Sequence, residues 1–114
     1  MMKAKLSGLA CVLALAACAP PPPANPMERH ARLAAAAELA AQRCPAQLGG
    51  YQGATQARQD ANRNMATARQ LGATDADIEK ARRDVRQALD AGTIWTTPQE
   101  ACNGLVGELA WQAG

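Results

Sequence analysis

The chain has 114 residues, and its 12 basic and 10 acidic side chains give a formal net charge of +2. Lys3 and Lys5, near the N-terminus, account for that excess, so the rest of the chain lacks the basic surplus typical of nucleic-acid-binding proteins. The length suits one small domain, and a composition without phenylalanine and rich in alanine and arginine favours helices.

Residues 1–17 have the pattern of a secretory signal. Lys3 and Lys5 precede an apolar run over residues 6–17, and the run closes on small residues. A helix that spans a bilayer needs roughly 20 apolar residues, and this run is shorter. We therefore expect a cleaved leader and not a permanent transmembrane anchor.

The leader ends in Leu15-Ala16-Ala17-Cys18, which resembles the lipobox of bacterial lipoproteins. The resemblance covers only the start of the chain. It implies a diacylglycerol group on Cys18, cleavage before that residue and acylation of the new amino terminus. In the enteric lipoprotein pattern, an aspartate directly after the cysteine favours retention in the inner membrane. This chain has Ala19 there, which resembles the pattern of outer-membrane lipoproteins. The implied protein is lipid-anchored in the cell envelope and faces the periplasm; an ordinary secretory leader with a chance cysteine is the alternative.

Residues 18–26 are expected to form a tether. Pro20 to Pro23 and Pro26 favour polyproline II, a stiff extended conformation. At about 3.1 Å per residue, such a tether would hold a domain roughly 25 Å from the lipid surface. A disordered linker and a proline-rich ligand for a partner domain are the alternatives. Residues 27–114 would then form the helical domain.

Four segments of that domain have helical periodicity: residues 27–44, 54–71, 75–91 and a segment that begins at Pro98. The first should end at Cys44, because Pro45 disfavours helical geometry in the residue before it. Residues 49–53 are predicted to form a loop. Gly72 can end the second helix and Thr74 can cap the third.

Gly92 is expected to end the third helix, and Thr97-Pro98-Gln99-Glu100 predicts a capping box for the fourth. The apolar faces are mostly alanine, so the predicted core is shallow. Opposite charges on the third helix are spaced for three i, i+4 ion pairs: Glu79 with Arg83, Lys80 with Asp84, and Arg86 with Asp90.

Cys44 and Cys102 are expected to form a structural disulfide, since a remote cysteine pair in the oxidising periplasm is usually bridged. In an up-down-up-down bundle the two residues lie at the same end. One straight helix over residues 54–91 would span about 57 Å and separate them. We therefore predict an all-α fold: a small antiparallel four-helix bundle stapled by one disulfide.

The sequence offers little catalytic chemistry. Ser7 lies in the leader and is the sole serine, which excludes a serine triad from the processed chain. No group of side chains has the spacing of a metal site, and we expect no cofactor. His30 is the one candidate base, and no nucleophile stands beside it in the sequence. A non-enzymatic protein is expected.

The expected function is a structural or protein-interaction role in the envelope, with an unidentified envelope protein as partner and with the oligomeric state open. A stress protein or chaperone that exposes apolar surface when its bundle loosens is the alternative. A third possibility is an inhibitor or small-ligand binder that uses the loop over residues 93–96 or Tyr51. Tyr51, Trp95 and Trp111 either cover the core or form an interaction surface.

Overall fold

The structure of the chain, a computed structural model, describes residues 23–113, and this part folds into helices without strands. The helices are α2 (Pro26–Arg43), α3 (Tyr51–Gln70), α4 (Asp75–Trp95) and α5 (Pro98–Ala113). The predicted leader, the predicted lipidation site Cys18 and most of the predicted tether lie outside the described residues. Within the described part, no helix combines the length and the apolar character needed to cross a bilayer.

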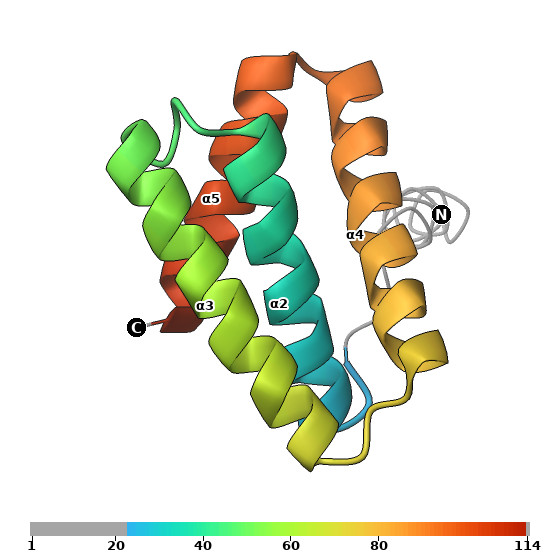
Figure 1. The fold of residues 1–114 in the computed structure, drawn as a ribbon. Helices are drawn as coiled ribbons and strands as arrows, with labels where there is room; N and C mark the ends of the chain where they lie inside the picture. The colour runs from blue at the N-terminus through green and yellow to red at the C-terminus, as the bar shows by residue number, and fades with distance from the viewer. Residues whose placement is uncertain (1–22, 114) are drawn as a thin grey trace, which may run out of the picture.

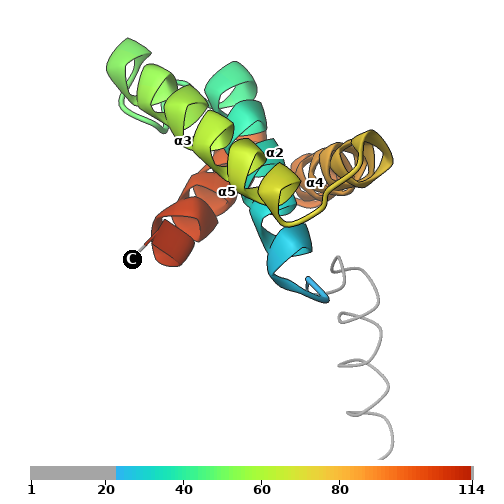
Figure 2. The same cartoon turned by 60° about the horizontal axis from the view of Figure 1, so that its bottom comes forward.

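Helix α2 is the centre of the domain. It packs against α3, α4 and α5, whereas α3 packs on α2 alone among the described helices. Successive helices run in opposite directions (Figure 1). Although α3 and α4 are consecutive, they lie on opposite sides of α2 (Figure 2). The predicted antiparallel four-helix fold is confirmed, with the helices grouped around α2.

The start of α2 is fixed by a capping residue that precedes the predicted boundary. Asn25 has extended backbone, and its Oδ1 accepts a hydrogen bond of 2.9 Å from the backbone N–H of Glu28. Pro26 occupies the first turn of the helix, where its missing N–H costs nothing. Pro26 is therefore helical, and assigning it to the extended tether was wrong.

The break between α3 and α4 lies where the sequence predicted it. Gly72 has φ +100°, a conformation that favours glycine, and α3 ends two residues before it. Thr74 caps α4: its Oγ1 accepts from the N–H of Asp77, and its own N–H donates to Asp77 Oδ2. This backbone N–H, helped by the Thr74 hydroxyl, lowers the pKa of Asp77 below its usual value.

Two helices are longer than expected. Helix α3 begins at Tyr51 and not at Ala54, because Gly50 at φ +88° turns the chain directly into the helix. Helix α4 runs through Gly92 to Trp95, which makes most of the predicted loop over residues 93–96 helical. A single interior glycine costs only about 1 kcal/mol. A Cβ at Gly92 would lie 3.5 Å from that of Ala101, so the glycine lets α5 approach closely.

The buried core is mostly alanine. The described residues that are nearly inaccessible to solvent are Ala31, Ala34, Ala35, Ala37, Leu39, Ala40, Ala41, Cys44, Ala54, Ala57, Ala61, Ala68, Ile78, Ala81, Leu89 and Cys102. Seven of them belong to α2. Small side chains let the neighbouring helices approach α2 closely, but each buries little apolar area. The core is therefore shallow, as the alanine-rich faces predicted.

Ion pairs join α4 to α2. Arg82 forms two hydrogen bonds of 3.1 Å to the two carboxylate oxygens of Glu38, and a third of 2.7 Å to Glu79. These bonds, chiefly those to Glu38, raise the pKa of Arg82 above its ordinary value. Five residues further along, at the C-terminal end of α2, Arg43 contacts Asp90 at 2.6 Å.

Only one of the three predicted ion pairs within the third helix is present as predicted: Lys80 and Asp84 lie 3.0 Å apart. Glu79 pairs with Arg82 at i, i+3 rather than with Arg83. Asp90 pairs across to α2 rather than with Arg86. Sequence spacing identified the charged face of the helix, but the neighbouring helix decided which partners meet.

Gly53 provides a test of how the loop after α2 packs on α3. A Cβ at this position would overlap the backbone carbonyl of Leu48. We expect Gly53→Ala to lower the free energy of unfolding by about 2–3 kcal/mol in urea denaturation, as overpacking against backbone does. The control is Gly107→Ala on α5, where the new methyl meets open space and should stabilise by about 1 kcal/mol. Equal effects of the two substitutions would contradict this packing.

Candidate functional site

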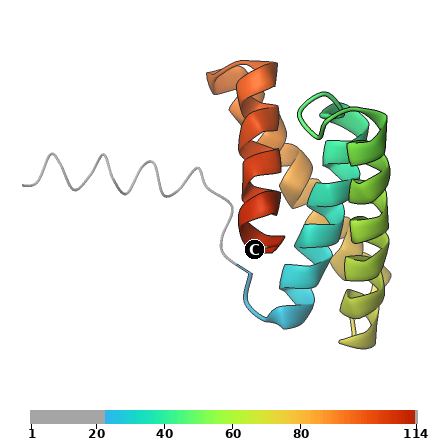
Figure 3. The ribbon, with the colours of Figure 1, turned by 90° about the vertical axis from the view of Figure 1, so that its left-hand side faces the viewer.

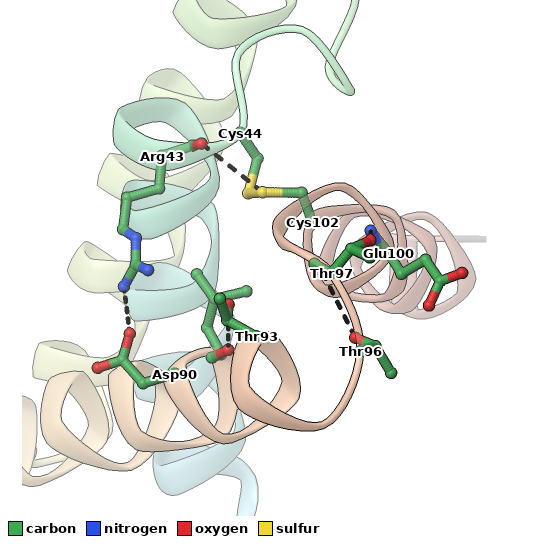
Figure 4. The surroundings of a disulfide bond; sticks show 9 residues. Arg43, Cys44, Asp90, Thr93, Thr96, Thr97, Glu100 and Cys102 are labelled. Carbon is green, nitrogen blue, oxygen red and sulfur yellow. Dashed lines mark hydrogen bonds and ion pairs between the residues drawn. A yellow bond between two sulfur atoms is a disulfide. The ribbon is translucent and has the colours of Figure 1, made fainter.

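The disulfide joins the end of α2 to the second turn of α5. Cys44 is the residue after the last one of α2, and its Sγ is bonded to that of Cys102, with the two Cα atoms 5.5 Å apart. Both residues are buried, and the bond closes the gap between the two helices (Figure 4). The predicted pairing is confirmed, and it ties the last helix of the domain to the first.

Helix α5 is covered less than the other helices. Cys102 is its one buried residue between Pro98 and Gln112, whereas Leu105, Val106 and Leu109 are half-buried. These three pack against the cluster that contains the disulfide. Helix α5 is therefore held covalently at its start and by partly covered aliphatic side chains along its length.

The exposed large apolar side chains lie at two opposite ends of the domain. Ile94 and Trp95, at the end of α4, are 80% and 83% exposed, and Tyr51, at the start of α3, is 83% exposed. These two helix ends lie at the same end of the domain as the disulfide (Figure 1). Trp111, in the last turn of α5 at the other end, is 82% exposed.

The aromatic residues therefore do not cover the core, and the structure does not unite them in one patch. Trp95, together with Ile94, forms an apolar projection that we call the distal patch. Tyr51 shares the end but begins a different helix, which does not pack against α4. Sequence reasoning grouped three residues by type, and the helix directions separated Trp111 from the other two.

Two grooves flank α5. The larger, about 660 Å³, lies between α2, α4 and α5, and its aliphatic lining includes Leu33, Ala36, Val85, Ala88, Leu105 and Leu109. The smaller, about 450 Å³, lies between α2, α3 and α5 and is lined by Leu33, Ala37, Leu48, Ala57, Val106 and Leu109. Both volumes are in the range of small-molecule sites. Sequence reasoning missed these grooves, because half-buried and fully buried positions have the same periodicity.

His30 borders the smaller groove and links two helices. Its Nδ1 lies 2.9 Å from Asn64 Oδ1, and because an amide oxygen only accepts, Nδ1 donates. Asn64 in turn donates through Nδ2 to the backbone oxygen of Asp60, at 3.0 Å. The geometry gives His30 a structural role between α2 and α3. Within residues 23–113, no cluster of three acidic, histidine or cysteine side chains is placed to hold a metal ion.

Comparisons of the chain with family models, with curated proteins and with solved structures find no match. Function is therefore inferred from the domain's own surfaces: the distal patch and the two grooves beside α5.

The disulfide should contribute a large share of the domain's stability. Replacing both cysteines, Cys44→Ala with Cys102→Ala, should lower the free energy of unfolding by about 4 kcal/mol, because the bond closes a loop of 58 residues. Hydrogen exchange should increase most in α5, the helix with the least buried surface. The oxidised parent chain is the control. Uniform loss of protection in all four helices would contradict the placement of α5 as the weakly held element.

Proposed function

We propose that the chain is a lipid-anchored protein of the bacterial envelope that presents a non-catalytic helical domain to a partner protein in the periplasm. The observation that carries the interaction role is the exposure of Ile94 and Trp95 at the distal end of α4. The lipobox-like Leu15-Ala16-Ala17-Cys18 and its apolar leader support the anchor. The outer membrane is the proposed location, because Ala19 follows the cysteine.

The position of the distal patch suits this role. The tether enters at the start of α2, and α2 is about 27 Å long at 1.5 Å per residue. Ile94 and Trp95 lie at the opposite end, which is also the end that holds the disulfide (Figure 1). A domain held by its tether would thus present the patch on the side away from the lipid surface, where a periplasmic partner has access.

The chemistry of the patch indicates what the partner must offer. Tryptophan and isoleucine are large apolar side chains, and tryptophan is enriched among the residues that dominate binding energy at interfaces. The Arg43–Asp90 ion pair and the hydroxyl of Thr96 lie beside the end of α4 (Figure 4). The expected partner therefore has an apolar pocket surrounded by polar groups.

A chaperone-like function is the second candidate, and the shallow cover of α5 favours it. If α5 separated from the domain, Leu39 and Leu89 in the cluster beneath it would become accessible. Such a protein would bind unfolded clients more strongly once the disulfide is removed, and it would not need Trp95. The docking function, by contrast, requires both the intact fold and the exposed side chains of the distal patch.

The anchor is tested by the intact mass of the protein purified from its natural envelope. We expect a chain that begins at Cys18 and carries a diacylglycerol group and an amide-linked acyl chain. Cys18→Ala is the control and should give a protein without these lipid groups. An unmodified residue 18 in the natural protein would overturn the anchor, and it would leave the fold and the distal patch unaffected.

The docking surface is tested by chemical cross-linking in intact cells. Trp95→Ala combined with Ile94→Ala should reduce the yield of the partner adduct at least about tenfold, since anchor residues of this type contribute about 2 kcal/mol or more. Trp111→Ala is the matched control: it removes an equally exposed tryptophan from the opposite end and should keep the adduct. Equal losses in both variants would remove the distal patch from the proposal.

A further inference from the structure

The two grooves beside α5 share one end. Arg29, Leu33, Leu109 and Gln112 border both grooves. They belong to the first part of α2 and the last part of α5, near the point where the tether enters the domain (Figure 3). The grooves thus start from a common mouth, and one follows each flank of α5.

The length of the grooves matches an acyl chain. The larger groove is bordered by α5 from Glu100 to Gln112, a rise of about 18 Å. The smaller groove follows α2 from Arg29 to Ala37, about 12 Å, and continues to Leu48 beyond the end of the helix. One leaflet of a bilayer's hydrocarbon core, half of roughly 30 Å, has a similar depth.

The mouth offers a cation to a phosphate. Arg29 is exposed, and no ion pair joins it to another residue of the described part of the chain. Of the acidic groups that neighbour it in the sequence or line the grooves, Glu28 pairs with Arg32, Asp60 with Arg63 and Asp84 with Lys80. Glu108 accepts a hydrogen bond from the neutral amide of Gln112, and Glu100 lies in the first turn of α5, away from the mouth. The guanidinium is therefore placed to form charge-assisted hydrogen bonds with an anionic group at the mouth.

Trp111 supports a lipid-facing orientation of this end. Its indole is 82% exposed and precedes Gln112 at the mouth. Tryptophan is enriched where proteins meet the boundary between lipid and water, because its ring is apolar and its N–H is polar. The end of the domain that bears Trp111 is also the end to which the tether leads.

We propose that the domain binds one glycerophospholipid with two acyl chains, one in each groove, and that Arg29 holds its phosphate at the shared mouth. Helix α5 then lies between the two chains. This inference goes beyond the proposed docking function: it concerns the opposite end of the domain, and it does not depend on acylation of Cys18.

A partner helix fits this arrangement less well than a lipid. A helix with its side chains is about 10–12 Å across, so a single helix would fill one groove and leave the other empty. The two grooves are separated by α5 and meet only at the mouth. A ligand with one polar group and two apolar branches uses both grooves and the cation together.

The test is native mass spectrometry of the full processed chain with phosphatidylglycerol as the probe. We expect one phospholipid per protein. Diacylglycerol lacks the phosphate and lysophosphatidylglycerol lacks one acyl chain. Each should bind at least about tenfold more weakly than phosphatidylglycerol. Equal binding of all three probes, or no binding of phosphatidylglycerol, would overturn the proposal.

Two matched substitutions locate the lipid. Gly104 borders the larger groove and Gly107 borders neither, and a Cβ at either position meets open space. Gly104→Leu should weaken phosphatidylglycerol binding about tenfold, whereas Gly107→Leu should leave it unchanged while adding the same side chain to the same helix. Arg29→Gln should also cost about tenfold, the loss expected for one charged hydrogen bond. Equal effects at positions 104 and 107 would contradict a lipid in the grooves.

Two other occupants are outcomes that would overturn the proposal. A photo-reactive amino acid in place of Gln112, activated in intact cells, should capture lipid; capture of a polypeptide would make the mouth a protein interface. The acylated protein could fail to bind phosphatidylglycerol while the Cys18→Ala protein binds it. That result would show that the protein's own N-terminal lipid occupies the grooves.

Discussion

The close packing of alanine faces around α2 is the constraint on which the rest of the domain depends. Ala34 and Ala40 of α2 are completely buried, and the helix supplies more buried residues than any other in the described part of the chain. Small side chains permit close approach but provide little hydrophobic area. Among the described helices α3 packs on α2 alone, so its place in the domain depends on this one interface.

The position of α5 follows from this constraint. A shallow alanine core leaves the last helix with one buried residue, Cys102, and that residue is held by the covalent bond to Cys44. Leu105 and Leu109 then remain half-covered, with a groove on each flank of the helix. The same shallow core therefore leaves α5 reliant on few buried contacts and leaves an apolar groove open on each side of it.

The domain has two chemically different ends. The tether end combines the start of α2, the exposed Arg29 and Trp111, and the mouth of both grooves. The distal end carries the exposed Ile94 and Trp95 and also holds the buried disulfide. Antiparallel helices bring the start of one element beside the end of another, so residues far apart in the sequence give each end its character. This difference between the ends underlies the two proposals, a lipid at the tether end and a partner protein at the distal end.

The sequence by itself determined the helices and the break at Gly72, because alanine periodicity, a glycine at positive φ and the Thr74 cap act locally. It also determined the cysteine pairing, because an antiparallel bundle brings Cys44 and Cys102 to the same end. Only the tertiary structure decided that α4 continues past Gly92 and that Asp90 pairs with Arg43, since both depend on a neighbouring helix. It also decided that the tryptophans are exposed at opposite ends and that grooves flank α5. Periodicity indicates which face of a helix is apolar, but the number of neighbours that cover this face is set by packing.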